Sequence, residues 1–422
     1  MSKPVDSGDH EPLQANVPSG SQSLLRIADF RRLWICDGLM FQGLWMESLV
    51  VGWLVLEMTD SPFWVAMIDF CRAIPVPFAG LFGPLLTDRF QRRRVILSLQ
   101  MLNAVVLVAL AGLFWIDALV YWHLAVAACV GGISWSLDWP NRRAFIPDIV
   151  GKSRVVDAIL LGNGVQAFAK LSGPLVAGAA LAVMGAGGAL VILASIAVVS
   201  SVVLFGIKSE SQSPDAPRGL SQSFSRVAEG LRYVRGQRVM LGIMVVTVIM
   251  NVWAFSFQSL LPVFARDEFA RGPVGLGILS SAVGLGSFLG LLCVTQIRHP
   301  DRRVQIFAGG SVLCCAGLLG FAGSGSFAVA AAMLLLVGLG QAGFSSMQSA
   351  ILLMGAPDDI RNRVMGTLVC AIGMGPFGRI QAGTLATVVG APIAVASMAG
   401  FGLIATLMTV ILLLGFVRPA RA

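Results

Sequence analysis

Charged residues are scarce in this sequence. They make up 12% of its 422 residues, whereas a soluble globular protein carries about 25%. Hydrophobic residues make up 56%, and the mean hydropathy is +0.82. Because no water-soluble fold hides that much apolar surface, the composition excludes a soluble protein and indicates a chain that crosses a membrane many times.

Motifs of enzymes, metal sites and disulfides are also missing. The sequence has no HExxH, GxSxG or P-loop pattern, and its three histidines are isolated. Its seven cysteines fall in apolar runs without CxxC or Cys/His spacing, which is typical of small core residues. One stretch, GLGQAG at 338–343, fits the dinucleotide pattern GxGxxG, but no strand precedes it, so close helix packing explains it. We therefore expect no enzyme activity, no metal and no cofactor.

A cleavable signal sequence is not expected either. Residues 1–28 are polar and contain no apolar stretch followed by a small-residue cleavage site, which predicts a disordered cytoplasmic tail. The net charge of +8 does not indicate nucleic-acid binding, because the basic residues lie at the ends of apolar runs, where the positive-inside rule explains them.

Twelve apolar runs are present, each near the roughly 20 residues that a membrane span needs. They are expected at 33–57, 62–86, 95–116, 118–137, 157–182, 185–207, 239–264, 273–296, 304–323, 326–354, 363–388 and 391–416. Lys and Arg cluster on alternate connections, and the opposite side has only Arg266 and Arg271. This pattern predicts an all-α membrane protein with both termini in the cytoplasm.

The longest polar connection falls after the sixth run and divides the chain into two halves. Within it, Phe224, Val227, Leu231 and Val234 recur at three- and four-residue steps, which predicts an amphipathic helix. Such a helix by default lies on the inner leaflet, with partner binding as the alternative. The expected parts are a tail, a six-helix half, a cytoplasmic linker, a second six-helix half and a short tail, at 1–28, 29–207, 208–238, 239–417 and 418–422.

A dense polar stretch, GPLLTDRFQRRRVI at 83–96, separates the second and third runs. It resembles the loop between helices 2 and 3 of the major facilitator superfamily of transporters in its Leu86, Asp88, Arg89, Arg92 and Arg93. Two positions depart from that signature, because Pro84 and Gln91 stand where glycines are usual. Other stretches are similar to the branch that holds enterobactin-type siderophore exporters and macrolide efflux pumps: PNRRAFIPDIVG, AKLSGPLVAG, RVAEGLRYVRGQ, APDDIRNRVMGT and GPFGRIQAG.

The resemblance implies the major facilitator fold, with a substrate site between two six-helix halves. It also implies a cytoplasmic clamp, in which Asp88 lies against the N-terminus of helix 11 near Arg363. Arg89 and Arg92 would pair with acidic groups of neighbouring helices, and Asp138 is the first candidate. The alternative is that these arginines only set the topology.

Two Gly-Pro pairs at equivalent places in the halves suggest hinges. Gly173 and Pro174 resemble the motif on helix 5 of antiporters in this superfamily, and Gly375 and Pro376 take the corresponding place on helix 11. Proline removes a backbone hydrogen bond and glycine allows close approach, so each pair permits bending.

Five ionisable residues lie in the middle of spans, where such groups face a cavity or a partner: Glu47, Asp69, Arg72, Lys170 and Arg379. Asp69 and Arg72 are three residues apart and share a helix face, so an internal salt bridge is one expectation. Glu47 is the first candidate for a proton carrier, tuned by Arg72, and Asp69 is the second.

The two remaining cations belong to opposite halves. Lys170 and Arg379 have no obvious second acid nearby, so an anionic or amphipathic cargo would supply the missing negative charge. Alternatively, Arg379 snorkels outward or pairs with Glu47. Arg72, Gln258 and Trp45 are expected to line the same cavity.

Together these features predict a monomeric secondary transporter in the bacterial cytoplasmic membrane. It would export a small siderophore-like or drug molecule by proton antiport with alternating access. The alternatives are a lysolipid or lipid flippase, a non-transporting sensor of the same fold, and import instead of export.

Overall fold

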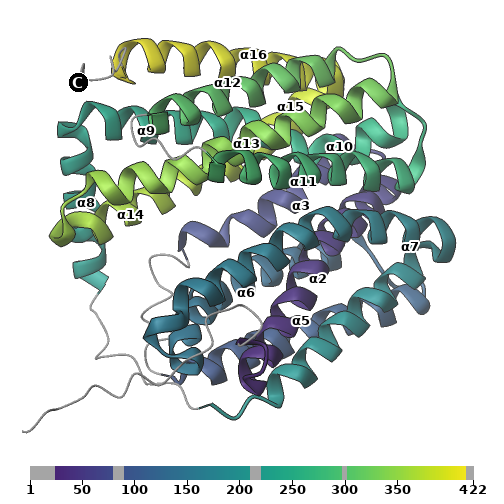
Figure 1. Cartoon of the computed structure of the whole chain (residues 1–422). Coiled ribbons are helices and arrows are strands. Elements are labelled where there is room, and N and C mark those ends of the chain that lie inside the picture. The colour runs from purple at the N-terminus through teal and green to yellow at the C-terminus, as the bar shows by residue number, and fades with distance from the viewer. Residues whose placement is uncertain (1–23, 79–89, 210–219, 297–301, 415–422) are drawn as a thin grey trace, which may run out of the picture.

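The computed structural model describes residues 24–78, 90–209, 220–296 and 302–414, and these residues form helices joined by short connections (Figure 1). The first half contains α2 (Ala28–Thr59), α3 (Pro62–Ala73), α5 (Arg92–Trp115), α6 (Tyr121–Val150), a turn of 3-10 helix (Lys152–Arg154) and α7 (Val155–Phe205). Although α7 runs for 51 residues, it contains a reversal at Gly185, whose φ is 69°. It therefore supplies two spans, since 51 residues in one rod would measure about 75 Å, more than twice the hydrocarbon thickness.

The second half begins after α8 (Leu220–Gly236). Its seventh span runs from Arg238 to Glu268 as α9 (Arg238–Ile249), η2 (Met250–Ala254), η3 (Phe255–Leu260), α10 (Leu261–Val263) and η4 (Phe264–Glu268). The remaining elements are α11 (Gly272–Gln296), α12 (Arg303–Ala322), α13 (Phe327–Gly355), α14 (Asp358–Ile372), α15 (Gly375–Val389), α16 (Ala391–Thr409) and η6 (Val410–Leu414).

Eight helices in the described ranges are long and apolar enough to cross a membrane. Because α7 is two spans, these eight account for nine of the twelve expected. The other three are α3, which is described only over a short range, the charge-bearing α6, and α14 with α15, which are separated by a break. The expected fold of twelve spans in two halves is confirmed.

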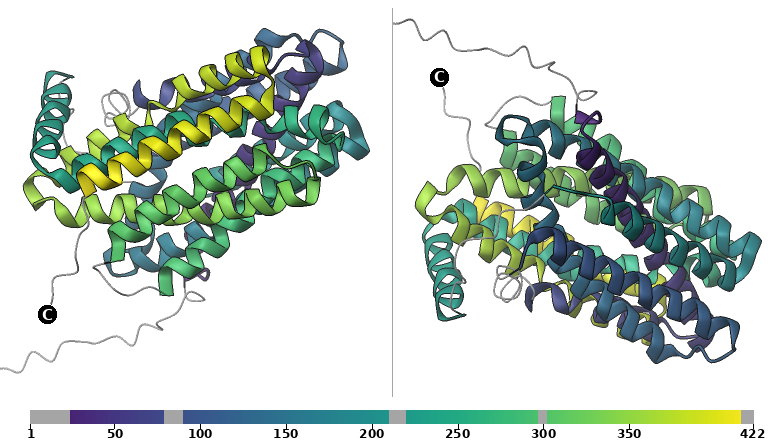
Figure 2. Two further views of the ribbon diagram at one scale, coloured as in Figure 1. Left: turned by 90° about the horizontal axis from the view of Figure 1, so that it is seen from above. Right: turned by 90° about the horizontal axis from the view of Figure 1, so that it is seen from below.

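The spans run side by side, and α8 crosses their ends (Figures 1 and 2). We refer to the end that carries α8, which the charge pattern predicts to face the cytoplasm, as the inner end, and to the opposite end as the outer end. Val234 of α8 is fully buried, and Glu229 forms an ion pair of 2.6 Å with Arg363 of α14. The amphipathic helix is therefore docked on the second half.

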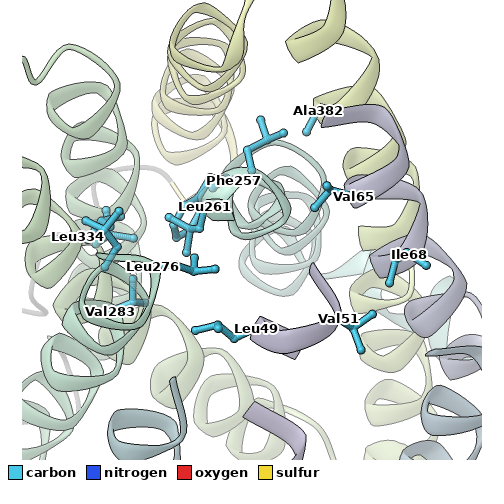
Figure 3. Packing of buried hydrophobic residues seen from close by; sticks show 14 of the residues in the cluster. Leu49, Val51, Val65, Ile68, Phe257, Leu261, Leu276, Val283, Leu334 and Ala382 are labelled. Atoms are coloured by element: carbon cyan, nitrogen blue, oxygen red, sulfur yellow. The ribbon is translucent and has the colours of Figure 1, made fainter. Parts of the chain in front are cut away.

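The two halves meet through an apolar core in the middle of the molecule. Figure 3 shows Leu49 and Val65 of the first half facing Phe257, Leu261 and Leu276 of the second, all of them buried. At the outer end the halves are joined by Arg266, which forms an ion pair with Asp60. The described hydrogen bonds between the halves lie at the middle of the spans or further out, and in Figure 1 the two halves diverge toward the inner end.

Close packing of helices explains the glycine-rich stretch at 338–343. A Cβ at Gly338 would overlap the carbonyl oxygen of Val283 in α11, and one at Gly340 would lie 2.5 Å from the carbonyl oxygen of Gly310 in α12. The glycines of α13 thus allow three helices of the second half to touch backbone to backbone, as the sequence predicts.

Candidate functional site

A cavity of about 70 Å³ lies between the two halves near the middle of the spans. The first half contributes Trp45, Asp69 and Lys170, and the second contributes Gln258 and Ser259. A larger cavity of about 320 Å³, nearer the inner end, shares Trp45 and Lys170 and adds polar groups from α7, α11 and α13. Three of the residues expected to line a cargo site do line this cavity, namely Trp45, Lys170 and Gln258, and the second proton-carrier candidate, Asp69, lines it with them. Their roles stay predictions.

Lys170 reaches across from α7 to the second half. Its Nζ donates hydrogen bonds to Ser287 Oγ at 3.0 Å and to Gln341 Oε1 at 2.9 Å, and it lies 5.7 Å from the centre of the Trp45 ring. All of these partners are uncharged, and the described residues place no carboxylate in a salt bridge with Lys170. The cavity therefore carries an ammonium group that forms no ion pair with any described residue.

Arg379 is placed differently from Lys170. It does not line either of these two cavities, and its Nη1 donates to the backbone oxygen of Asp69 at 2.9 Å. The Asp69 carboxylate accepts a hydrogen bond of 2.7 Å from Ser259 Oγ. Asp69 of α3 therefore forms hydrogen bonds with both the seventh and the eleventh span. These bonds connect α3 to the second half at the level of the cavity.

Glu47 and Arg72 form a buried ion pair inside the first half. Arg72 Nη1 lies 3.2 Å from Glu47 Oε1, and Glu47 is 4% exposed. The expected salt bridge between Asp69 and Arg72 is not formed. The Asp69 carboxylate instead accepts a hydrogen bond from Ser259, and Arg72 forms its ion pair with Glu47. Arg72 does not line either central cavity, and its Nε and Nη2 are buried without a partner among the described residues.

A second buried charge cluster surrounds Arg142 of α6 and was not predicted, because the fourth span was expected to end at 137, before this residue. Arg142 is 1% exposed and donates to Asp138 Oδ2 and Asp37 Oδ1, both at 2.7 Å, and to Gln100 Oε1 at 2.6 Å. Because α6 continues to Val150, the polar stretch after 137 is helical rather than a loop. The spacing of four between Asp138 and Arg142 is the signal that would have indicated a pair on one helix face.

Comparisons with known proteins agree with this architecture. The model of the transmembrane secretion effector family matches residues 19–418. The chain belongs to this family of major facilitator transporters. It is 22% identical to the staphyloferrin A transporter of Staphylococcus aureus, over 67% of this chain and 70% of that protein. It is 24% identical to the multidrug efflux pump Tap of Mycolicibacterium fortuitum, over 80% of this chain and 84% of that protein.

Solved transporter structures share the fold. A point mutant of the nucleoside transporter NupG superimposes with a TM-score of 0.72 at 12% identity, covering 90% of this chain and 98% of that one. A bacterial homologue of the human lysosomal transporter Spinster, in an inward-facing and unoccupied conformation, gives 0.68 at 14% identity, covering 92% and 94%. These structures show the shared fold, and the family match identifies the protein as a multi-pass membrane transporter and not an enzyme.

The expected clamp of the transporter is only partly within the described residues. Asp88 and Arg89 lie outside them. Arg92, at the start of α5, donates to Asp148 Oδ2 at 3.0 Å and not to Asp138. The partner differs from the expected one because the Asp138 carboxylate is already held by Arg142, whereas Asp148 lies near the inner end of α6.

The two expected hinges of the transporter differ in shape. Helix 11 is interrupted between Ile372 and Gly375, and Pro376 stands in the first turn of α15. By contrast, α7 continues through Gly173 and Pro174, and its reversal lies further on at Gly185. A Cβ at Gly173 would lie 2.7 Å from that of Trp45, so this glycine allows α7 to pack against α2. Their hinge roles stay predictions.

Proposed function

We propose that this transporter exports a small anionic or amphipathic molecule from the cytoplasm in exchange for protons. The observation that carries the proposal is Lys170, a cation between the two halves with only uncharged partners. A carboxylate or phenolate of the cargo would complete the charge balance there and also cover the Trp45 ring. The names of the relatives, a staphyloferrin A transporter and a multidrug efflux pump, support export of this chemical class.

A separate apolar hollow lies in the inner part of the first half. It measures about 1090 Å³ and lies between the inner parts of α2 and α7, lined mainly by apolar side chains that include Trp34, Leu160 and Phe168. Phe168 is 67% exposed there. The hollow shares no lining residue with the two cavities that contain Lys170, and Phe168 lies on the opposite face of α7 from Lys170. The amphipathic part of the proposal therefore does not rest on this hollow.

Glu47 would carry the proton. When Glu47 is ionised, it holds Arg72 by their ion pair. Protonation removes that charge and leaves Arg72 without its acidic partner, which favours movement of α3. Because α3 is also the element whose Asp69 bonds Ser259 and Arg379 of the other half, the proton state of Glu47 would be transmitted to the interface between the halves.

Transport in proteoliposomes tests the proposal. Purified protein is given a pH gradient, and proton flux is recorded with a panel of carboxylate, catecholate, cationic and lysolipid cargoes. We expect anionic cargoes to drive proton flux, Lys170→Gln to weaken their binding, and Glu47→Gln to abolish flux while binding persists. Lys208→Gln and Glu57→Gln are matched controls on exposed side chains and should behave as the wild type.

Three results would change this proposal. Proton flux driven only by cationic cargoes would show that Lys170 does not bind an anionic group of the cargo. Proton flux that persists in Glu47→Gln would show that Glu47 is not the proton carrier, and Asp69 would be tested next. Movement of lysolipid without proton flux would favour a flippase.

A further inference from the structure

A separate cavity of about 50 Å³ lies wholly inside the first half. It is enclosed by α2, α5, α6 and α7, and it shares no lining residue with the two cavities that contain Lys170. Several of its lining groups are polar, although the spans around it are apolar: Glu47, Gln100, Asn103, Ser134, Asp138 and Ser200.

The two carboxylates of this cavity lie at different depths. A Cβ at Gly131 of α6 would be 3.5 Å from Glu47 Oε1, so Glu47 is level with Gly131. Asp138 follows seven residues later on the same helix, about 10 Å nearer the inner end. The cavity therefore extends from the proposed proton carrier toward the cytoplasmic side of the first half.

Two polar atoms on the cavity wall have no protein partner. Asp138 Oδ1 and Ser134 Oγ are buried without a hydrogen bond to any described residue, and these side chains belong to residues only 4% and 7% exposed. A buried carboxylate oxygen without a donor is costly, and native structures fill such polar hollows with ordered water. The volume is sufficient for a few water molecules.

Asp138 shares its cationic partner, Arg142, with a second carboxylate. Arg142, on the same helix as Asp138, donates to the carboxylates of Asp138 and of Asp37 in α2. It also donates to the Cys36 sulfur of α2. The cavity residues of α5 and α7 are uncharged. Arg143 donates to Asn163 and also attracts the Asp37 carboxylate, whereas Asp138 has only Arg142 as its cation among the described residues and is repelled by Asp37. A proton on Asp138 would remove this repulsion and supply the missing donor.

We infer that this cavity is a water-filled proton path inside the first half and that Asp138 is its inner proton-binding residue, exchanging protons with Glu47. The inference rests on the proposed function, in which Glu47 carries the proton. A proton leaves the Glu47 carboxyl, passes along water beside Ser134, and binds Asp138 Oδ1 before it reaches the cytoplasm. Only O–H bonds are broken and formed, and the proton avoids the cavity that holds the cargo.

Two variants test the path. Asp138→Asn removes the inner acceptor. Gly131→Ala places a methyl group at ordinary contact distance from Glu47 and Asn103, so it fits the fold but takes up the space for water beside Glu47. Asp117→Asn on an exposed outer turn and Gly112→Ala, whose Cβ meets no atom within 4 Å, are the matched controls.

Three measurements are made on each variant: cargo-driven proton flux, cargo affinity by tryptophan fluorescence, and a pH titration of carboxylic-acid bands by infrared spectroscopy without cargo. We expect flux to fall by about a hundredfold in Asp138→Asn and clearly in Gly131→Ala, while cargo affinity is kept. In the infrared titration, Asp138→Asn removes one protonated-carboxyl band and Glu47→Gln removes another.

The other outcomes separate failure of the proton path from failure of the proposed function. Wild-type flux that is abolished by Glu47→Gln but unchanged in Asp138→Asn and Gly131→Ala would overturn the path and leave the proposed function intact. Absence of cargo-driven flux in the wild type would overturn the proposed function, and the infrared bands would still decide whether Asp138 binds a proton. If Asp138→Asn does not fold, Gly131→Ala alone decides: unchanged flux overturns the path.

Discussion

Two buried arginines of the first half differ in how completely they are bonded. Arg142 is held by two carboxylates, by Gln100 and by the Cys36 sulfur. Arg72 has one acidic partner, Glu47, and two of its nitrogens are buried without a partner among the described residues. Full bonding fixes a side chain, whereas partial bonding leaves it ready to move. Arg142 therefore acts as a structural centre, and Arg72 is the arginine suited to a change of state.

Replacement of Arg142 should strongly destabilise the protein. Arg142→Met removes the cation that bonds both Asp37 and Asp138, a loss of about 3–5 kcal/mol. Arg143→Met, one residue away and only partly buried, should cost far less. Thermal unfolding in detergent measures both, and equal melting temperatures would show that the cluster contributes little.

Two neighbouring glycines of α6 should differ in how much stability the protein loses when each is replaced by alanine. A Cβ at Gly132 would overlap the backbone oxygen of Arg72, so Gly132→Ala must push α3 away from α6 and should cost about 1–3 kcal/mol. Gly131→Ala meets only ordinary contacts and should keep the wild-type melting temperature. A similar melting temperature for the two variants would contradict the packing of α3 on α6.

At the level of elements, the apolar runs were sufficient to predict the spans, because a membrane helix is defined by its length and composition. The extent of α6 was not predictable in this way, since its polar end after 137 resembles a loop in composition. Glu47 and Lys170 were predictable as candidate site residues because an ionisable group in a span normally faces a cavity or a partner, and the structure places Lys170 in a cavity and Glu47 in an ion pair. The partners of Arg72 and Arg379 were not, because these contacts join distant segments, and one of them is a backbone oxygen.

The docking of α8 on the second half gives a prediction at the same scale. Val234 is fully buried, whereas Leu231 of the same helix is 46% exposed. Val234→Ser should remove about 2 kcal/mol of apolar burial and detach α8, and Leu231→Ser should have a small effect. Hydrogen exchange over 220–236 measures the release, and unchanged protection in Val234→Ser would show that the apolar face does not hold this helix.

At the scale of the whole molecule, the outer end is closed by few contacts. Arg266 of the second half donates to the backbone oxygen of Leu56 and forms an ion pair with Asp60 of the first half. Since Asp60 is largely exposed, the pair contributes at most about 1 kcal/mol. A small contribution of this kind would suit a contact that opens and closes during transport, as the predicted alternating access requires.

Removing this contact should shift the population toward a state that is open at the outer end. Arg266→Ala should change the ratio of open to closed molecules by up to about fivefold. Distances between spin labels at Asp117 and Val389, on the outer ends of the two halves, report the change. Arg271→Ala is the matched control, because Arg271 lies over the Phe327 ring within the second half. Equal distance distributions in the two variants would show that the ion pair does not hold the outer end closed.

The contact between α7 and α11 has a geometric consequence for the cargo site. A Cβ at Gly178 would lie 2.6 Å from the backbone oxygen of Pro273, and one at Gly284 would lie 2.6 Å from that of Lys170, so along this seam the two halves touch at the backbone. When two bodies roll on each other, the points nearest the line of contact move least. Lys170 stands on that line, so its ammonium group would stay almost in place while the two ends of the molecule part in turn. The cargo would then be presented to either side of the membrane without being carried across it.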